Sequence, residues 1–189
     1  MLRIIAGRMR GHRLRTPKGR TTRPTSDRVR EALFNILGGR VIDSRFLDLF
    51  AGSGAVGLEA LSRGAREAVF IENNRQALAC LHANLVAVGF QDQGRIMPVD
   101  ARRALVDLAA RDCIFDLVYI DPPYRQGWGA IVLPMAAAVL APAGLAILET
   151  AAAEAGSPPA AMIMKARRVY GDTALNFYTR AGGLAGWSL

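Results

Sequence analysis

Apolar residues recur along this chain with two alternating periods. From residue 45 onward, short apolar runs that fit buried strands alternate with longer segments in which apolar residues return at helical spacing. The pattern predicts strands at residues 46–50, 68–72, 95–99, 115–120 and 144–149, with helices at 55–63, 75–88, 101–111 and 128–140. Strands that alternate with helices form a parallel sheet covered on both faces, so this region is predicted to be an α/β domain.

The end of the chain has a different pattern. Two strand-like segments, 166–170 and 174–180, are separated only by Gly171-Asp172-Thr173. That connection is too short for a crossover helix, so the two strands must form an antiparallel hairpin. A mostly parallel, seven-stranded sheet that ends in an antiparallel hairpin resembles the Rossmann-like sheet of class I methyltransferases.

The beginning of the chain predicts a small appendage. Residues 2–6 and 12–16 alternate around Gly7 and Gly11, which favours a short two-stranded ribbon. Residues suited to capping then precede a helix that carries Val29, Leu33 and Phe34 at helical spacing. We therefore predict a basic N-terminal hairpin arm over residues 1–24 and a main domain over residues 25–189.

Charge is concentrated in that appendage. Residues 1–30 hold ten basic side chains and one acid, whereas the remaining 159 residues carry 14 basic and 15 acidic groups, so the net charge of +8 comes from the first sixth of the chain. Nine of the ten bases are arginine, which favours bidentate phosphate contacts. A polyanionic partner is indicated, although a solvated basic tail remains the alternative. The residues predicted to contact nucleic acid are Arg3, Arg8, Arg10, Arg13, Arg15, Arg23 and Arg28.

The rest of the composition excludes several classes of protein. There is no long uncharged apolar stretch of the kind that spans a membrane, and the N-terminus has no signal-peptide pattern, so we expect a cytoplasmic protein. Cys80 and Cys113 lack metal-ligand spacing and are expected to be buried hydrophobes. We predict neither a metal site nor a membrane contact, and we expect a monomer.

A glycine loop at the end of the first predicted strand is the candidate cofactor site. The segment from Asp48 to Gly57 leaves a strand, enters a helix and contains Gly-x-Gly-x-x-Gly, and Glu72 ends the next strand. By itself the loop could bind a dinucleotide, with Glu72 on the ribose hydroxyls. Asp48, however, would repel a pyrophosphate and would complement the cationic end of S-adenosylmethionine. Asp100, after the third strand, could accept a hydrogen bond from adenine or could instead cap the following helix.

Asp121-Pro122-Pro123-Tyr124 follows the fourth predicted strand and is the candidate reacting site. Two prolines keep the backbone extended, so the Asp121 carboxylate and the Pro122 carbonyl can act as two acceptors for one amine. Such acceptors would orient the lone pair of an exocyclic base amine for methyl transfer. Tyr124 would provide a ring on which the base stacks. The alternative is a rigid structural turn with a core tyrosine.

With these motifs in place, the chain resembles the RsmD family of bacterial methyltransferases, which modify a guanine N2 in 16S ribosomal RNA. The resemblance rests on residues 3–7, 22–25, 27–31, 34–35, 48–60, 62–65 and 121–124 and so extends over most of the chain. It implies S-adenosylmethionine as methyl donor and the small ribosomal subunit as partner. It further implies a guanine held by residues 121–124 and a cofactor held by Asp48, Gly52, Gly54, Glu72 and Asp100. The predicted cofactor site also includes their neighbours Phe50, Ala51, Ser53, Asn73 and Ala101.

Three other functions compete with this prediction. An adenine-N6 methyltransferase acting on DNA would use the same Asp-Pro-Pro-Tyr chemistry, but the chain offers no second domain large enough to read the major groove. A nicotinamide dehydrogenase would need a histidine or a tyrosine–lysine pair near the strand ends, which the pattern does not provide. A catalytically silent RNA-binding module would leave residues 121–124 unexplained.

Overall fold

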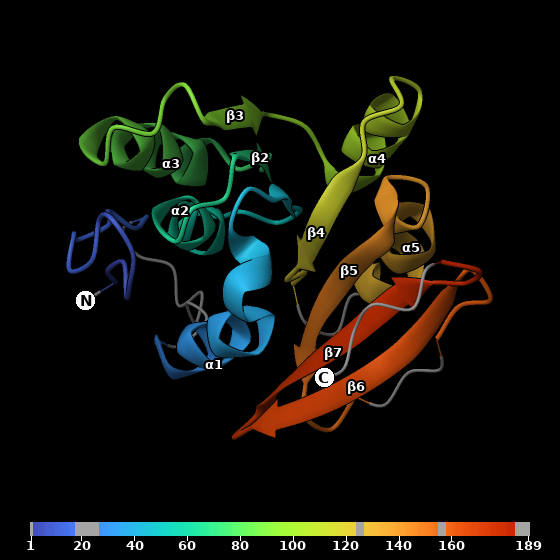
Figure 1. Cartoon of the computed structure of the whole chain (residues 1–189). Helices are drawn as coiled ribbons and strands as arrows, with labels where there is room; N and C mark the ends of the chain where they lie inside the picture. The colour runs from blue at the N-terminus through green and yellow to red at the C-terminus, as the bar shows by residue number, and fades with distance from the viewer. Residues whose placement is uncertain (1, 18–26, 124–126, 155–157, 184–189) are drawn as a thin grey trace. The chain divides into compact units, whose positions relative to one another are not determined.

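The structure is a computed structural model that describes residues 2–17, 27–123, 127–154 and 158–183. The chain divides into two compact units, Met1–Asp100 and Ala101–Leu189 (Figure 1). Each unit combines helices with part of a β-sheet, and the units are described in turn. The glycine loop belongs to the first unit and the Asp-Pro-Pro segment to the second.

The first unit is a three-stranded parallel sheet with helices. Its elements are α1 (Asp27–Leu37), the short 3₁₀ helix η1 (Gly38–Val41), β1 (Arg45–Asp48), α2 (Ala55–Ser62), β2 (Glu67–Ile71), α3 (Arg75–Ala87) and β3 (Gly94–Met97). The strands lie in the order β3-β2-β1 and all pairs are parallel. Phe46, Leu47 and Phe70 are fully buried, as expected for strands covered on both faces. The parallel order brings the ends of β1 and β2, and thus Asp48 and Glu72, to the same sheet edge.

The second unit carries the antiparallel end of the fold. Its elements are α4 (Ala101–Ala109), β4 (Phe115–Ile120), α5 (Trp128–Ala136), β5 (Leu140–Ala151), β6 (Met162–Tyr170) and β7 (Thr173–Arg180). β4 and β5 are parallel, whereas β7 pairs antiparallel with both β5 and β6. The predicted C-terminal hairpin is therefore confirmed, and with it a mostly parallel α/β fold of seven strands.

The predicted end of the fifth helix is wrong. The apolar pattern extended the fifth helix to residue 140, but α5 ends at Ala136 and Leu140 already belongs to β5. The Phe115 amide donates to the Val139 carbonyl at 2.8 Å, and Phe115 pairs with Leu140. A run of apolar residues that is buried on all sides fits a helix or a strand equally well by its pattern. Here the pairing of Leu140 with β4 makes this segment a strand.

The N-terminal residues form a shorter version of the predicted two-stranded ribbon. A single antiparallel bridge joins Arg3 to Arg13, and the Leu14 amide donates to the Leu2 carbonyl at 3.0 Å. Leu2, Ile4 and Leu14 are buried. The limit predicted at residue 24 lies outside the described residues. Within the described ranges, no helix is long and apolar enough to cross a membrane.

Candidate cofactor loop and N-terminal hairpin

Asp48 is the buried carboxylate of the glycine loop. It is the last residue of β1 and only 2 % exposed, and its Oδ2 accepts a hydrogen bond from the Gly57 amide of α2 at 3.0 Å. Burial raises the pKa of the Asp48 carboxyl to about 7; the Gly57 hydrogen bond opposes this rise and the negative charge of Glu72 adds to it. A desolvated carboxylate beside a second carboxylate favours a cationic ligand.

Glu72 organises the loop from the end of β2. Its Oε2 accepts from the Gly52 amide at 2.8 Å, and its Oε1 accepts from the amides of Asn73 and Asn74 at 2.9 and 2.7 Å. Each oxygen of a carboxylate has two lone pairs, so these three bonds leave one lone pair, on Oε2, for a ribose hydroxyl. The sequence predicted Glu72 as the last residue of its strand, and in the structure it directly follows β2, which ends at Ile71. The bonds to the loop backbone are an additional role that the pattern did not indicate.

Two glycines of the loop are required by geometry. Gly54 has φ +84°, and a Cβ placed there would lie 2.3 Å from the Leu81 Cδ1 of α3. A Cβ on Gly57 would lie 2.3 Å from the Phe70 ring of β2. Gly52 also has positive φ, at +55°, but a Cβ there would meet nothing within 4 Å. The loop is thus packed tightly against β2 and α3, while Gly52 has space beside it for a ligand.

The remaining predicted cofactor residues lie around this loop or at the boundary of the two units. Phe50 and Ser53 are partly exposed, Ala51 is buried and Asn73 is exposed. Asp100 is partly exposed and precedes α4, whose first residue, Ala101, is buried. The third strand is shorter than predicted and ends at Met97, so Asp100 follows it by three residues.

Asp121 is the first residue after β4, as predicted. It is partly exposed, Pro122 is buried and Pro123 is exposed. Tyr124 lies outside the described residues. The strand-end position of the segment is confirmed, and the catalytic role of these residues stays a prediction.

The N-terminal hairpin is attached to α2 through a buried carboxylate. Glu59 is fully buried, and its two oxygens accept hydrogen bonds from the amides of Ile5 and Ala6 at 2.7 and 3.0 Å. The Arg63 side chain donates to Glu59 Oε1 at 2.7 Å, and the Arg30 Nε lies 4.0 Å from Glu59 Oε2. Arg30, itself fully buried, also donates to the Arg3 carbonyl at 2.5 Å. The hairpin, α1 and α2 therefore share one buried charged network.

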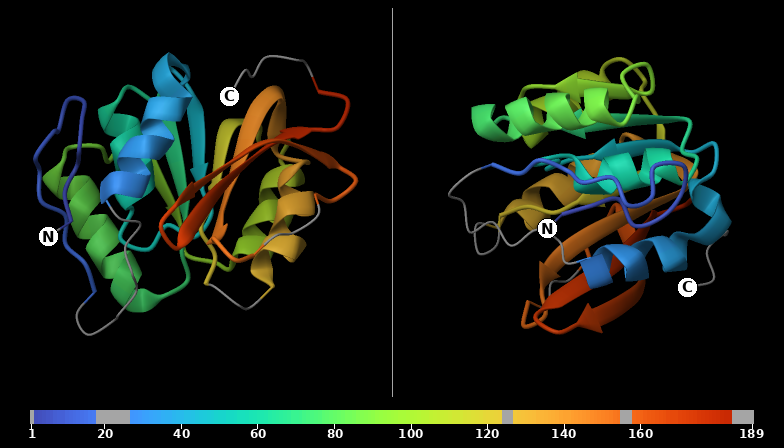
Figure 2. Two further views of the ribbon diagram at one scale, coloured as in Figure 1. Left: turned by 90° about the horizontal axis from the view of Figure 1, so that it is seen from below. Right: turned by 90° about the vertical axis from the view of Figure 1, so that its left-hand side faces the viewer.

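A second attachment runs through α3. Asn84 is 1 % exposed, and its Oδ1 accepts from the Arg15 amide at 2.8 Å. Its Nδ2 donates to the Arg15 carbonyl at 3.0 Å and to the Ser53 carbonyl at 2.9 Å. One side-chain amide thus contacts both the hairpin backbone and the glycine loop. Figure 2 shows the N-terminal segment, in blue, alongside α3, in green.

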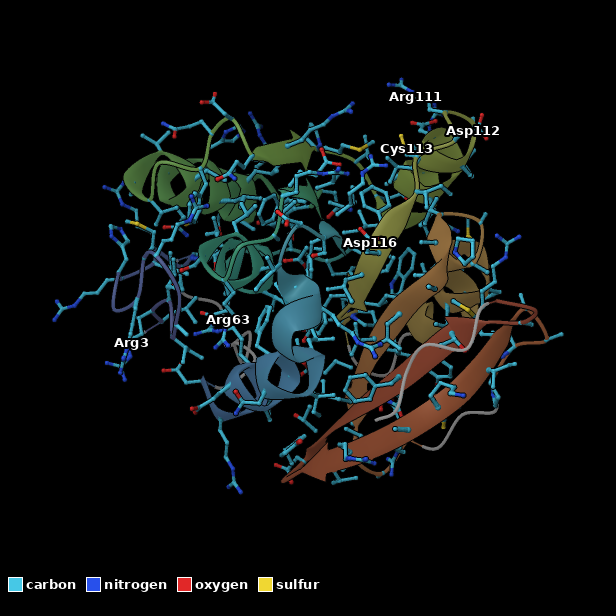
Figure 3. All side chains as sticks on the ribbon, viewed as in Figure 1. Arg3, Arg63, Arg111, Asp112, Cys113 and Asp116 are labelled. Carbon is cyan, nitrogen blue, oxygen red and sulfur yellow. The ribbon has the colours of Figure 1, made fainter. Side chains whose placement is uncertain are left out.

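The arginines predicted to bind nucleic acid are exposed wherever the structure describes them. Arg3, Arg8, Arg10, Arg13, Arg15 and Arg28 are all exposed, and Arg23 lies outside the described residues. Arg3 projects outward from the N-terminal segment, whereas Arg63 lies beside α1 (Figure 3). Arg8 has an additional structural role, because its guanidinium donates to Gln93 at 3.1 Å and lies 5.1 Å from the centre of the Phe90 ring. Exposure fits the predicted role without testing it.

Sequence reasoning missed Glu59, Arg30 and Asn84. One signal was available for Glu59: it is the single acid in an otherwise apolar helical segment, Ala55–Ser62. A charged residue on such a helix is buried only with partners. The partners are more than fifty residues away in sequence, at Ile5 and Ala6, so the pattern could not name them.

Comparison with known proteins gives a consistent assignment. The model of a family described as "Conserved hypothetical protein 95" matches residues 2–179. The Escherichia coli protein "Ribosomal RNA small subunit methyltransferase D" is 44% identical over 126 residues, which cover 67% of this chain and 62% of that protein. The Bacillus subtilis protein "Putative rRNA methyltransferase YlbH" is 38% identical over 125 residues, 66% of this chain and 68% of that protein.

Solved structures agree with the fold. The structure of "Putative methyltransferase yhhF" from Escherichia coli is 36% identical, with a TM-score of 0.83, and the match covers 96% of this chain and 98% of that one. This likeness confirms the predicted class I methyltransferase fold. The chain therefore belongs to the family described as Conserved hypothetical protein 95, which is the RsmD family that its sequence motifs resemble.

Proposed function

We propose that this protein transfers a methyl group from S-adenosylmethionine to the exocyclic N2 amine of a guanine in the RNA of the small ribosomal subunit. The observation that carries the proposal is the buried carboxylate Asp48 beside Glu72 at a glycine loop. Membership of the RsmD family supports the RNA substrate, since the Escherichia coli relative is named for the small ribosomal subunit. The aligned residues span 62% of that relative, so its activity is carried over here as a proposal.

The chemistry of the loop fits this cofactor. S-adenosylmethionine has a sulfonium and an ammonium group, and a carboxylate as desolvated as Asp48 is stabilised when a cation takes up the space beside it. Glu72 Oε2 retains one lone pair for a ribose hydroxyl, and Gly52 allows close approach of a ligand to the backbone. When bound, the cofactor would supply an electrophilic methyl group, and its sulfonium sulfur would leave as a neutral thioether.

Asp121 orients the guanine amine and can accept the proton that the amine loses. An amine conjugated to a purine ring is a weak nucleophile, because its lone pair is delocalised into the ring. Hydrogen bonds from its two N–H groups to the Asp121 carboxylate and the Pro122 carbonyl hold the amine in one orientation. After the nitrogen gains the methyl group it carries a positive charge, and its proton passes to Asp121 or to water. Tyr124 provides a surface on which the base stacks.

Product analysis tests the proposal directly. The protein is incubated with methyl-labelled S-adenosylmethionine and, in separate reactions, with naked 16S ribosomal RNA, small ribosomal subunits and duplex DNA. N2-methylguanine in the RNA or in the subunits is the expected product, and Asp121→Ala should abolish it. Labelled N6-methyladenine in DNA would instead favour the adenine methyltransferase. Absence of label from all three substrates, with intact cofactor binding, would refute methyl transfer to these nucleic acids.

The exposed arginines of the hairpin are proposed to bind RNA phosphates. Each arginine that contacts a phosphate displaces a condensed counterion, so the double variant Arg10→Ala/Arg13→Ala should lower the slope of log affinity against log salt by about 1.4–1.8. Arg8 is omitted from the variant because it also packs on Phe90. Arg66→Ala/Arg111→Ala removes the same charge from exposed positions outside the hairpin. Equal slopes in the two double variants would show that the hairpin arginines do not contribute specifically to RNA binding.

A further inference from the structure

The side chain of Asn84 contacts two parts of the protein for which separate ligands are proposed. Its amide bonds to the backbone of Arg15 in the basic hairpin and to the backbone of Ser53 in the glycine loop. We infer that Asn84 is a positioning residue that couples RNA binding at the hairpin to cofactor binding at the loop. This inference rests on the proposed function and deepens it.

The geometry of the Asn84 side-chain amide links the position of the Arg15 backbone to that of Ser53. Oδ1 accepts from the Arg15 amide at 2.8 Å while Nδ2 donates to the Arg15 carbonyl at 3.0 Å, so two bonds to one residue fix the plane of the amide. The second Nδ2 proton then points in a defined direction, in which it meets the Ser53 carbonyl at 2.9 Å. A shift of the Arg15 backbone therefore changes the bond to Ser53.

Ser53 is the residue of the loop that such a change reaches directly. It lies between Gly52 and Gly54, which both have positive φ and lack side chains that would restrict the backbone. Asn84 supplies a hydrogen bond to this tripeptide from outside the loop. Because Gly52 also donates to Glu72, the orientation of the tripeptide determines how the loop presents its backbone to the cofactor.

Helix α3 is a rigid support for this contact. Asn84 lies on the buried face of α3 together with Ala77, Leu81 and Leu85. The Leu81 side chain fills the space next to Gly54, so α3 contacts the loop at two successive residues. Asn84 itself is 1 % exposed, so its polar atoms depend on the Arg15 and Ser53 partners.

The consequence is a reciprocal coupling. RNA held by the exposed hairpin arginines restrains the Arg15 backbone, which orders the amide of Asn84 and the Ser53 carbonyl. Cofactor binding that orders the loop restrains the hairpin by the same path. Thermodynamic linkage requires both effects to have the same size. We expect the cofactor to bind about tenfold more tightly in the presence of RNA, within the usual range for such coupling.

Calorimetry of S-adenosylmethionine binding, with and without saturating RNA, tests this coupling. The RNA is naked 16S ribosomal RNA or the small ribosomal subunit, whichever the wild-type protein binds. Asn84→Ala should bring the ratio of the two affinities from about tenfold to nearly one. His82→Ala, an exposed change on the same helix, should keep the wild-type ratio. A residue with only a structural role would weaken both affinities and leave their ratio unchanged.

Hydrogen exchange in the wild-type protein gives a second measurement that needs no variant. The Arg15 amide proton is bonded to Asn84 Oδ1, so its exchange should slow when S-adenosylmethionine is added, although the cofactor loop is a separate segment. Independent affinities in the wild type, an unchanged ratio in a folded Asn84→Ala variant, or unchanged exchange of the Arg15 amide would each overturn the coupling. A wild-type protein that bound neither ligand would refute the proposed function, and the coupling with it.

Discussion

Replacing Asp48 by asparagine should stabilise the ligand-free protein at neutral pH and weaken its binding of S-adenosylmethionine. In the folded protein the pKa of the Asp48 carboxyl is raised from 3.8 to about 7, chiefly by burial. The folded state therefore retains this proton to a higher pH than the unfolded state. Stability from the protonated carboxyl is complete below about pH 4 and is lost progressively as the pH rises to about 7.

The size of the effect follows from the two pKa values. Each pH unit between them is worth about 1.4 kcal/mol, so the raised pKa of Asp48 lowers the free energy of unfolding, relative to its value at low pH, by about 4 kcal/mol at pH 8 and by about 2 kcal/mol at pH 5, where only the unfolded state has ionised. Asparagine cannot ionise, and its side-chain oxygen can still accept from the Gly57 amide. The stability of Asp48→Asn relative to the wild type should thus increase by about 3 kcal/mol between pH 5 and pH 8.

Urea unfolding of both proteins at pH 5, 6, 7 and 8 measures this difference, and any pH-independent effect of the substitution cancels. Asp92→Asn, at an exposed position, controls for the loss of a surface charge. The same Asp48 variant should bind S-adenosylmethionine more weakly, because the carboxylate that complements the cation is gone. A stability difference that stays constant from pH 5 to pH 8 would refute the argument that burial holds this carboxyl partly protonated.

Three further substitutions test other parts of the structure. Asp121→Asn should reduce methyl transfer by at least about a hundredfold, as loss of a proton acceptor does, with unchanged S-adenosylmethionine affinity in calorimetry; near-normal turnover would move the reacting site elsewhere. Glu59→Gln should lower the free energy of unfolding by about 3 kcal/mol in urea, because it removes the buried negative charge that lies between the buried Arg30 and the partly exposed Arg63, and the exposed Glu31→Gln should change it little. In thermal unfolding, Gly54→Ala should lower the free energy of unfolding by about 1–3 kcal/mol more than Gly171→Ala, since both glycines have positive φ but only Gly54 is crowded. Equal losses would show that the Leu81 side chain moves aside without a cost in stability.

The order of elements was determined by the sequence itself. Apolar periodicity reports which residues face the core, and the lengths of the connections fix which strands run parallel. For this reason the starts of α2 and α3 and the C-terminal hairpin agree with prediction. The positions of Asp48, Glu72 and Asp121 at or just after strand ends follow from the same order, since each comes directly from its place in a strand pattern.

Tertiary structure alone decided which polar groups are buried and what they contact. Asn84 bonds to Arg15, 69 residues earlier, and Glu59 to Ile5, 54 residues earlier. No local period encodes such a pair, because a polar group is buried only if distant parts of the chain supply its hydrogen bonds. The same holds for the pKa of Asp48: the sequence placed the carboxylate at the loop, but desolvation by the surrounding fold raised its proton affinity.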